Sequence, residues 1–167
     1  IEPEYDYVLP EGFQEGLAGV AYESTSYGEN WWRKMGFIDE TGKVVIPLQY
    51  DYADSFSDGV AAVKVEKKEN GVSIGYGAID KEGNEVLPLK FSSVGKYQDG
   101  MMPVAWQNSA IGFYNKEGKK ITPYKYSSVI APKEGLRIVA TNMNSEDGTD
   151  GSEQEILYGT EIGRASC

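Results

Sequence analysis

The chain repeats one short segment three times: MGFIDETGKVVIP at residues 35–47, YGAIDKEGNEVLP at 76–88 and IGFYNKEGKKITP at 111–123. Each copy has glycine at its second position, then an aliphatic or aromatic residue followed by aspartate or asparagine, then a second glycine and a closing proline. Because the same residue types return at the same offsets, the segment marks a tandem repeat.

The centre of each segment predicts a β-hairpin. The turn residues are Asp39, Asp80 and Asn115, and the glycines that follow them are Gly42, Gly83 and Gly118. The side chain of an aspartate or asparagine can accept hydrogen bonds from backbone N–H groups ahead of it, and glycine supplies the positive φ that closes a type I turn with a G1 bulge. The closing proline cannot donate to a ladder, so it is expected to end the second strand at an edge or a bend.

The residues after each proline repeat as well. Further glycines stand at Gly59, Gly100 and Gly135, and valines follow four positions later at Val63, Val104 and Val139. This pattern predicts that the valines are buried in matching strands. The first residues of the chain fit this half of the repeat alone, since Phe13 and Gly16 match Phe56 and Gly59.

Together these patterns predict the organisation of the chain. Residues 1–22 are the second half of a repeat, 23–35 a linker, 36–76 and 77–111 full repeats, 112–158 a repeat with an acidic insertion, and 159–167 the start of a further repeat or a tail. Because Ile1 already stands inside a repeat, we expect a fragment or a mature form, with any targeting signal outside it.

Composition limits the partners. The formal net charge is −10, with 26 acidic against 16 basic residues, which argues against nucleic acid or an anionic membrane surface as the main partner. No window is apolar enough to span a bilayer. The single cysteine, Cys167, excludes an intrachain disulfide and a thiolate metal cluster. The compartment stays open, with the cell envelope or secretion favoured over the cytoplasm.

Candidate catalytic and metal-binding groups are few. The chain has no histidine, and turn formation already explains Asp39 and Asp80, so we expect no enzyme, no catalytic residue and no cofactor. The acidic stretch at residues 142–151 has oxygen-bearing side chains at alternate positions, but it does not match an EF-hand loop. We expect a disordered acidic loop there and no metal.

The aromatic residues are the best candidates for a binding surface. Trp31 and Trp32 lie in the linker with Tyr27, and Trp106 follows Val104. Exposed aromatic rings can stack on sugars or anchor a protein partner, whereas the alternative is that they fill gaps between units. Adjacent strand residues face opposite sides, so Trp31 and Trp32 can hardly both lie in one core.

The segment at 35–47, continued by Tyr50-Asp51, Phe56 and Gly59, resembles the bacterial WG-repeat family, also called KWG repeats. The Trp-Gly pair that names the family is absent, because Met35, Tyr76 and Ile111 stand in place of its tryptophan. The resemblance implies bacterial β-repeat arrays of variable copy number without a defined catalytic activity.

Two functions follow as expectations. The first is a non-catalytic module for protein–protein interaction or scaffolding, and the alternative is a glycan-binding accessory module of a cell-envelope protein. The expected fold is all-β, with tandem hairpin or meander repeats in an open array, and the alternative is a small closed propeller-like ring completed by the two end halves. An open array has unpaired edges, so end-to-end self-association is also expected.

Overall fold

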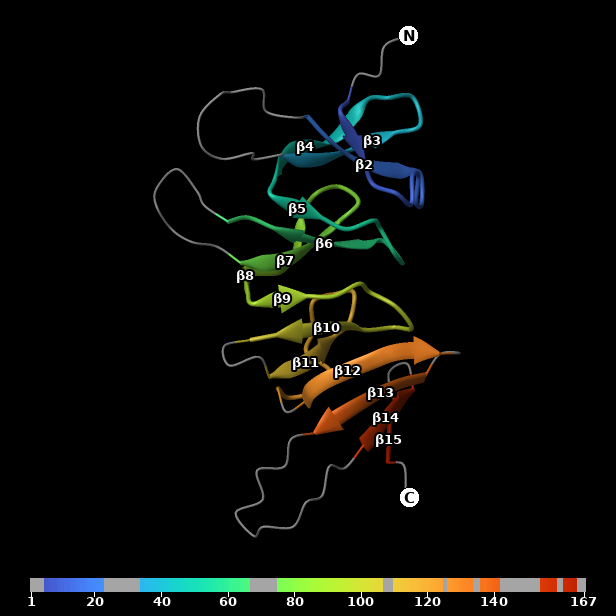
Figure 1. The fold of residues 1–167 in the computed structure, drawn as a ribbon, viewed down its shortest axis with the longest axis vertical. Coiled ribbons are helices and arrows are strands. Elements are labelled where there is room, and N and C mark those ends of the chain that lie inside the picture. The colour runs from blue at the N-terminus through green and yellow to red at the C-terminus, as the bar shows by residue number, and fades with distance from the viewer. Residues whose placement is uncertain are drawn as a thin grey trace.

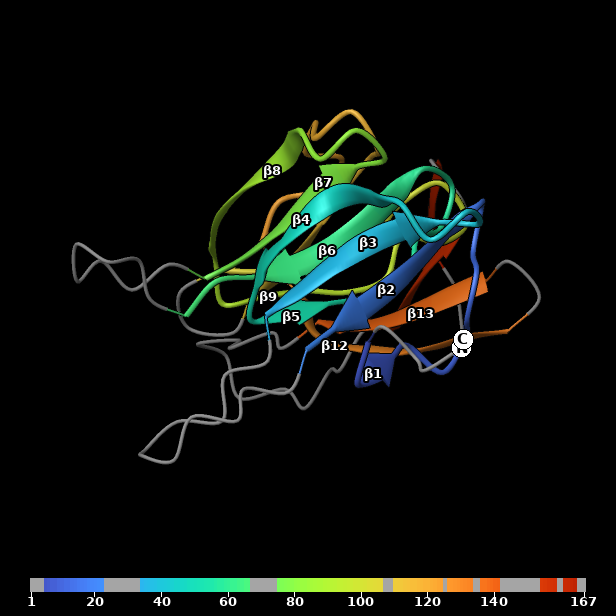
Figure 2. The same ribbon diagram turned by 90° about the horizontal axis from the view of Figure 1, so that it is seen from above.

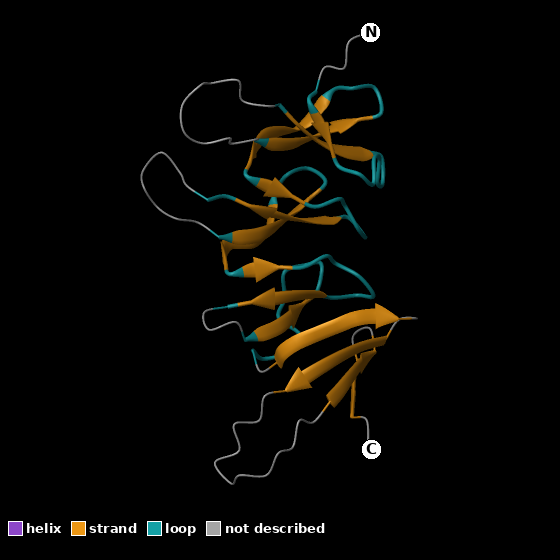
Figure 3. Ribbon diagram, viewed as in Figure 1, coloured by secondary structure: helices purple, strands orange, loops and turns teal. Residues whose placement is uncertain are grey.

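The fold is built from strands and turns. The computed structural model describes residues 5–22, 34–66, 75–106, 110–124, 126–133, 136–141, 154–158 and 161–164, and these contain strands but no helix (Figure 3). In this part of the chain there is accordingly no helix with the length and apolar content needed to cross a membrane. The all-β prediction is confirmed.

The strands form three antiparallel sheets. The first sheet contains β1 (Tyr7–Val8), β2 (Leu17–Ala21), β3 (Met35–Asp39) and β4 (Val44–Tyr50), in that order. The second contains β5 (Tyr52–Ala53), β6 (Val60–Lys64), β7 (Tyr76–Asp80) and β8 (Glu85–Phe91). The third contains β9 (Ser93–Val94), β10 (Met102–Ala105), β11 (Ile111–Tyr114), β12 (Tyr126–Lys133), β13 (Leu136–Thr141), β14 (Gln154–Tyr158) and β15 (Glu161–Arg164).

The sheets follow one another along the long axis of the molecule, with β2 and β3 near one end and β14 and β15 near the other (Figure 1). Viewed along that axis, the strands of successive sheets lie over one another (Figure 2). At one end β1 pairs with β2, and at the other β14 pairs with β13 and β15. The two part-copies therefore do not complete a common sheet, and the predicted open array is confirmed.

Each sheet joins two neighbouring copies of the repeat. The last strand of one copy, β6, pairs with the first strand of the next, β7, so that Val63 faces Gly77 and Val60 faces Asp80. The chain passes to the next sheet within a copy, at Asp51 between β4 and β5 and at Ser92 between β8 and β9. Because its strands belong to two sheets, one copy of the repeat ties two layers together.

The predicted hairpin turns are confirmed. The backbone N–H of Asp39 donates to the carbonyl oxygen of Lys43 at 2.9 Å, and Gly42 at φ 85° donates back to the carbonyl oxygen of Asp39 at 2.9 Å. The same pair of hydrogen bonds recurs at the turns that begin at Asp80 and Asn115. A two-residue turn with positive φ closes the other hairpin, at Asp58 (51°) and Gly59 (82°), because such a turn matches the twist of the strands it joins.

Pro47 and Pro88 lie in edge strands, as predicted, but they do not end those strands, and Pro123 of the third copy lies between β11 and β12. Pro47 stands inside β4, where Met35 pairs with Tyr50 and Phe37 pairs with Ile46, so β4 bulges opposite Gly36. The bulge approaches so closely that a Cβ on Gly36 would lie 2.5 Å from the carbonyl oxygen of Ile46. The opening glycine of the repeat is therefore required by a close backbone contact.

The core lies between the sheets. Between the first and second sheets, Phe37 and Ile46 pack in one buried cluster with Phe56, Val63 and Ile79. The ring centroids of Phe37 and Phe56 are 4.8 Å apart at an interplanar angle of 61°. β6 is almost continuously buried because its two faces belong to two such clusters, with Ala61 and Val63 in one and Val60 and Ala62 in the other.

A second buried cluster lies between the second and third sheets. It contains Leu87 and Phe91 of the second sheet with Val94, Tyr97 and Val104 of the third. The predicted burial of the valines is confirmed at Val63 and Val104, both 0% exposed. For the third valine, Val139, the structure describes the backbone alone, which pairs with Val129.

At the C-terminal end β13 pairs with β14, which places Glu155 opposite Val139. Opposite Val63 and Val104, the corresponding places are held by Gly77 and Gly112.

Candidate functional site

Of the four aromatic residues predicted as a binding surface, one is described. Trp31, Trp32 and Tyr27 lie outside the described residues, as does the acidic stretch at 142–151. Trp106 follows β10, and its backbone N–H donates to the carbonyl oxygen of Ala110 at 3.2 Å. The candidate site is therefore built from Trp106 and the residues around it.

Trp106 is half-buried against the core of the second and third sheets. Its ring meets Phe91 edge-on, with centroids 5.4 Å apart at 70°. The ammonium group of Lys90 lies 5.5 Å from the indole centroid and 5.7 Å from the centroid of Phe91. One part of the indole thus fills a gap between layers and another faces a cation.

The pairing of Trp106 with Phe91 repeats along the array. At the first sheet, Tyr22 stands at the equivalent position to Trp106, and Tyr5 at the equivalent position to Phe91; their ring centroids are 5.0 Å apart. In the middle copy a buried Val65 takes the place of the tryptophan. The position is thus filled by tyrosine, valine or tryptophan in the three copies, and at Trp106 the indole packs on the core of the second and third sheets.

A second group of side chains crosses the second sheet at the same end of its strands. Tyr52 pairs with Lys64, and Lys64 pairs with Tyr76. The ring centroids of Tyr52 and Tyr76 are 5.9 Å apart, and the Lys64 ammonium lies 5.3 Å from the Tyr76 centroid. Tyr52 is 42% exposed, so this row, here called the Tyr-Lys-Tyr row, presents an aromatic surface to solvent.

The row follows from local sequence differences between the copies. In the third sheet the positions of Tyr52 and Lys64 are held by Ser93 and Ala105, which pair with each other in the same register. The row was not predicted, because the residues that form it are not among those that the copies share. A comparison of the residues in which one copy differs from the others would have found it.

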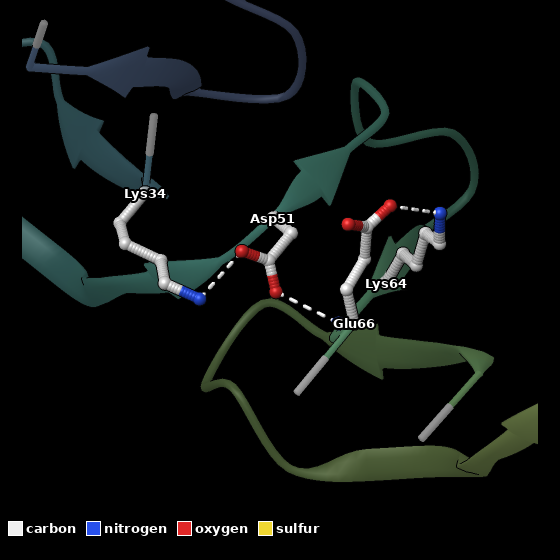
Figure 4. Close-up of polar contacts among 4 residues, drawn as sticks. All are labelled: Lys34, Asp51, Lys64 and Glu66. Carbon is white, nitrogen blue, oxygen red and sulfur yellow. Dashed lines mark hydrogen bonds and ion pairs between the residues drawn. The ribbon is translucent and has the colours of Figure 1, made fainter. Parts of the chain in front are cut away.

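Charged groups lie around Asp51, where the chain crosses from the first sheet to the second beside the Tyr-Lys-Tyr row (Figure 4). Asp51 accepts a hydrogen bond from the Lys34 ammonium at 2.6 Å and another from the backbone N–H of Glu66 at 2.8 Å. The Asp51 side chain is 6% exposed and that of Lys34 is 41% exposed. Lys64 forms an ion pair with Glu66, and this hydrogen bond raises the pKa of Lys64.

The positive charge of the Tyr-Lys-Tyr row therefore interacts mainly with neighbouring groups of the same chain. The ammonium of Lys64 lies between the Glu66 carboxylate and the Tyr76 ring. Burial is the main cause that raises the pKa of Tyr52, with nearby acidic groups acting in the same direction. The Tyr52 hydroxyl thus stays neutral and can donate or accept a hydrogen bond at a protein surface.

Asp39 and Asp80, the two carboxylates that most resemble catalytic groups in the sequence, stabilise the hairpin turns. Asp39 Oδ1 accepts hydrogen bonds from the Thr41 hydroxyl at 2.6 Å and from the backbone N–H of Thr41 at 2.9 Å. The Thr41 hydroxyl is the main cause that holds the pKa of Asp39 below its usual value. Partial burial acts to raise the pKa of Asp80, but hydrogen bonds from Asn84 and the turn backbone outweigh it and lower that pKa. A general acid would need the opposite shift.

Metal binding has no support in the described part of the chain, where no three aspartate, glutamate, histidine or cysteine side chains gather closely enough to hold an ion. What the arrangement offers is an aromatic surface with one exposed tyrosine ring, flanked by charges that are already paired. Such a surface can contact another macromolecule through apolar area and a few hydrogen bonds.

Comparison with known families gives one match. A family model described as WG containing repeat matches residues 1–23, 35–68, 76–105 and 111–142. Each of the last three matched segments starts at, or next to, the first strand of a hairpin, at β3, β7 and β11. No curated protein matches the chain.

Proposed function

The chain belongs to the WG-repeat family, and from that premise we propose that it is a non-catalytic module that binds another protein. The observation that carries the proposal is the Tyr-Lys-Tyr row. It places a 42% exposed tyrosine ring on a rigid sheet, where the next copy of the repeat has only serine. Tyrosine is enriched among the residues that contribute most to protein interfaces.

The rigidity of the row supports this reading. Tyr52 lies in a strand, its ring contacts that of Tyr76, and Lys64 is held by Glu66. Ordering these side chains on binding costs little conformational entropy, because neighbouring contacts already restrict them. Asp51 precedes Tyr52 at the point where the chain passes from the first sheet to the second. Its hydrogen bond from Lys34 links the row to the first sheet.

The test uses residues that the repeat itself supplies. Tyr52→Ser and Lys64→Ala introduce the residues that Ser93 and Ala105 hold at the equivalent positions of the third sheet, so we expect the fold to tolerate both changes. We expect the double variant to lose a protein that wild type captures quantitatively from lysate of its host cell. Val44→Ser, which changes a similarly exposed residue (41%), is the matched control and should keep that protein.

Equal capture by the double variant and wild type would contradict the proposal. Circular dichroism and thermal unfolding of the three proteins establish that each is folded. Purified partner and isothermal titration then measure the loss directly, and removal of one well-placed tyrosine at an interface costs about 2 kcal/mol, or roughly thirtyfold in Kd.

A second candidate function is glycan binding, as an accessory module of a bacterial cell-envelope protein. The exposed ring of Tyr52 supports it, because an aromatic face can stack on a sugar. The row favours the protein partner, since the neighbouring charges are paired with each other and leave few polar groups for sugar hydroxyls. A glycan array that detects binding by wild type and none by the Tyr52→Ser variant would favour the glycan.

The absence of catalysis is part of the proposal. Asp39 and Asp80, the carboxylates closest to a catalytic pattern in the sequence, have their Oδ1 atoms engaged by turn hydrogen bonds. We expect no turnover in broad hydrolase, transferase and redox screens. A turnover that disappears in a folded Asp39→Asn or Asp80→Asn variant would overturn this part.

A further inference from the structure

Three side chains on the third sheet are larger than their counterparts on the second. Trp106, Tyr114 and Tyr124 pack on the cluster between the second and third sheets, and all three are half-buried. One copy earlier, the same repeat positions hold aliphatic residues that pack between the first and second sheets: Val65, Ile79 and Leu89. The aromatic side chains therefore fill the gap between layers and also reach the surface.

The rings form one continuous run across the junction of the two sheets. The ring of Phe91, from the second sheet, has its centroid 5.4 Å from that of Trp106 and 5.8 Å from that of Tyr114. The centroids of Tyr114 and Tyr124 are 6.3 Å apart. Phe91 also pairs with Tyr76, so the run begins where the Tyr-Lys-Tyr row ends.

A lysine lies over a ring at each end of this run. The ammonium of Lys90 is 5.5 Å from the centroid of Trp106, and that of Lys120 is 5.3 Å from the centroid of Tyr124. Both lysines are exposed to solvent, and attraction to the ring face favours this position of each ammonium. The lysines and the four rings are here called the Lys-aromatic strip: Lys90, Phe91, Trp106, Tyr114, Lys120 and Tyr124.

The ammonium groups of the strip have no carboxylate partner. The ion pairs within the described part of the chain join Lys34 and Lys64 to acidic residues, whereas Lys90 and Lys120 take part in none. An ammonium group carries three N–H donors and no acceptor. Both lysines therefore keep a positive charge and free donors at the surface.

The hydroxyl and indole groups of the strip add further donors. The hydroxyl oxygens of Tyr114 and Tyr124 are 2.7 Å apart, so one donates to the other, which keeps its own proton for an outside acceptor. Burial is the main cause that raises the pKa of Tyr124, so its hydroxyl stays protonated. The indole N–H of Trp106 reaches solvent, since in the described part of the chain the buried side-chain atom without a hydrogen-bond partner is Asp99 Oδ2.

We infer that the Lys-aromatic strip binds an acidic peptide segment, whose carboxylates contact the ammonium groups of Lys90 and Lys120 while its chain lies along the rings between them. The donor set fits this ligand, because the strip offers ammonium, hydroxyl and indole donors and has no carboxylate of its own. The inference rests on the proposed function in that the ligand is part of a protein, but it concerns other residues than the Tyr-Lys-Tyr row.

The arrangement of the rings favours a peptide over an acidic saccharide. A sugar stacks on an open aromatic face, but Lys90 covers a face of Trp106 and Lys120 covers a face of Tyr124. The ring of Phe91 meets the rings of Trp106 and Tyr114 edge to face, at 70° and 61°. An extended peptide with glutamate side chains reaches both ammonium groups without stacking on a ring.

The probe for this site is an oligoglutamate peptide, titrated into the full chain at low and at physiological ionic strength. The net charge of −10 repels an anionic peptide, so its binding requires a local cationic site. The test variant combines Lys90→Gln and Lys120→Gln, and Gln49 already holds the position of Lys90 in the preceding copy. Lys119→Gln is the matched control, because it removes an exposed lysine next to Lys120 that is not part of the strip.

We expect wild type to bind oligoglutamate with an affinity that falls as salt rises, because exposed ion pairs are screened. The Lys90→Gln, Lys120→Gln double variant should lower the affinity by at least about tenfold, since each exposed ion pair contributes a few-fold. Lys119→Gln should change the affinity by less than about twofold. The Tyr52→Ser, Lys64→Ala variant should bind oligoglutamate as wild type does, so a failure of the strip and a failure of the row are distinguishable.

Three results would overturn the inference. The first is that wild type does not bind oligoglutamate, or that the double lysine variant binds it equally well; the proposed function still stands if the row variant loses its captured protein. The second is that Lys119→Gln weakens binding as much as the double variant does, because binding is then not local to the strip. The third is that polyglucuronate, an acidic saccharide, binds the strip more tightly than oligoglutamate.

Discussion

The rings of Phe37 and Phe56 meet edge to face, with centroids 4.8 Å apart, although the two residues belong to different sheets. Phe37 lies in β3 of the first sheet, and Phe56 lies between β5 and β6 of the second. Both lie in the segment 35–68, which the family model matches as one copy of the repeat. The contact therefore holds two layers together through one repeat unit.

Loss of the Phe56 ring should destabilise the array. Phe56→Ala removes a side chain that is 2% exposed and leaves a cavity against Phe37, so we expect a loss of about 3–5 kcal/mol in the free energy of unfolding. Urea denaturation measures it. Val44→Ala, at a residue 41% exposed, is the control and should cost well under half as much. Equal losses would contradict the packing between sheets.

The opening glycine should not tolerate a methyl group. Gly36→Ala places a Cβ 2.5 Å from the carbonyl oxygen of Ile46, so the β4 bulge must move away, and we expect a loss of about 2–4 kcal/mol. Gly59→Ala is the control, because Gly59 has open space around it and only its φ of 82° opposes the change. That strain costs about 1 kcal/mol. Thermal unfolding should rank Gly36→Ala as the more destabilising change.

The crossover aspartate should stabilise the junction between the first two sheets. Asp51→Ala removes the acceptor for the backbone N–H of Glu66 and the partner of Lys34. We expect a loss of about 1–3 kcal/mol, most of it from the N–H group that is left without its acceptor. Lys34→Ala removes the half-exposed partner alone and should cost less than 1 kcal/mol. A larger loss from Lys34→Ala would reverse this assignment.

Acid should weaken the hairpin turns. The pKa values of Asp39 and Asp80 are lowered by hydrogen bonds in the folded state, so both groups stabilise the fold above the usual value of 3.8. That contribution is lost as the pH falls through the lowered pKa values. Asp39→Asn and Asp80→Asn should therefore flatten the pH dependence of stability below about pH 4.

The third turn shows that this substitution is compatible with the fold. Asn115 holds the equivalent position, and its side-chain oxygen accepts a hydrogen bond from the backbone N–H of Lys119 at 2.8 Å. The Asn variants should accordingly remain folded at pH 7. Glu40→Gln, which changes the side chain next to Asp39, is the control and should leave more of the acid sensitivity in place. An unchanged slope in the double Asn variant would contradict the role of these carboxylates.

Local sequence was sufficient to predict the hairpins and their turns. An aspartate or asparagine followed by glycine three residues later determines a type I turn with a G1 bulge by its own backbone chemistry, and the structure confirms it at Asp39, Asp80 and Asn115. The burial of Val63 and Val104 was equally predictable, because apolar residues at matching positions of short strands face a core. The all-β class followed from the same repeat, and the preference for an open array over a closed ring followed from the family resemblance.

The tertiary structure alone decided which strands share a sheet. The sequence defines a repeat that starts at Gly36, but β6 of one copy pairs with β7 of the next, and β5 leaves the sheet of β4. This pairing depends on contacts between copies, which a local pattern does not contain. The reason for Gly36 likewise became visible only when the β4 bulge was placed against it.

The candidate site likewise depends partly on what the sequence shows and partly on what only the tertiary structure decides. The sequence identified Trp106 as an aromatic of interest, yet its packing on Phe91 depends on how the third sheet packs on the second. The Tyr-Lys-Tyr row joins residues of β5, β6 and β7, and the pairing of these strands decides that their side chains meet. Sequence thus determined the local conformations, because turns and strand patterns are set by neighbouring residues, and the packing of layers determined which side chains meet.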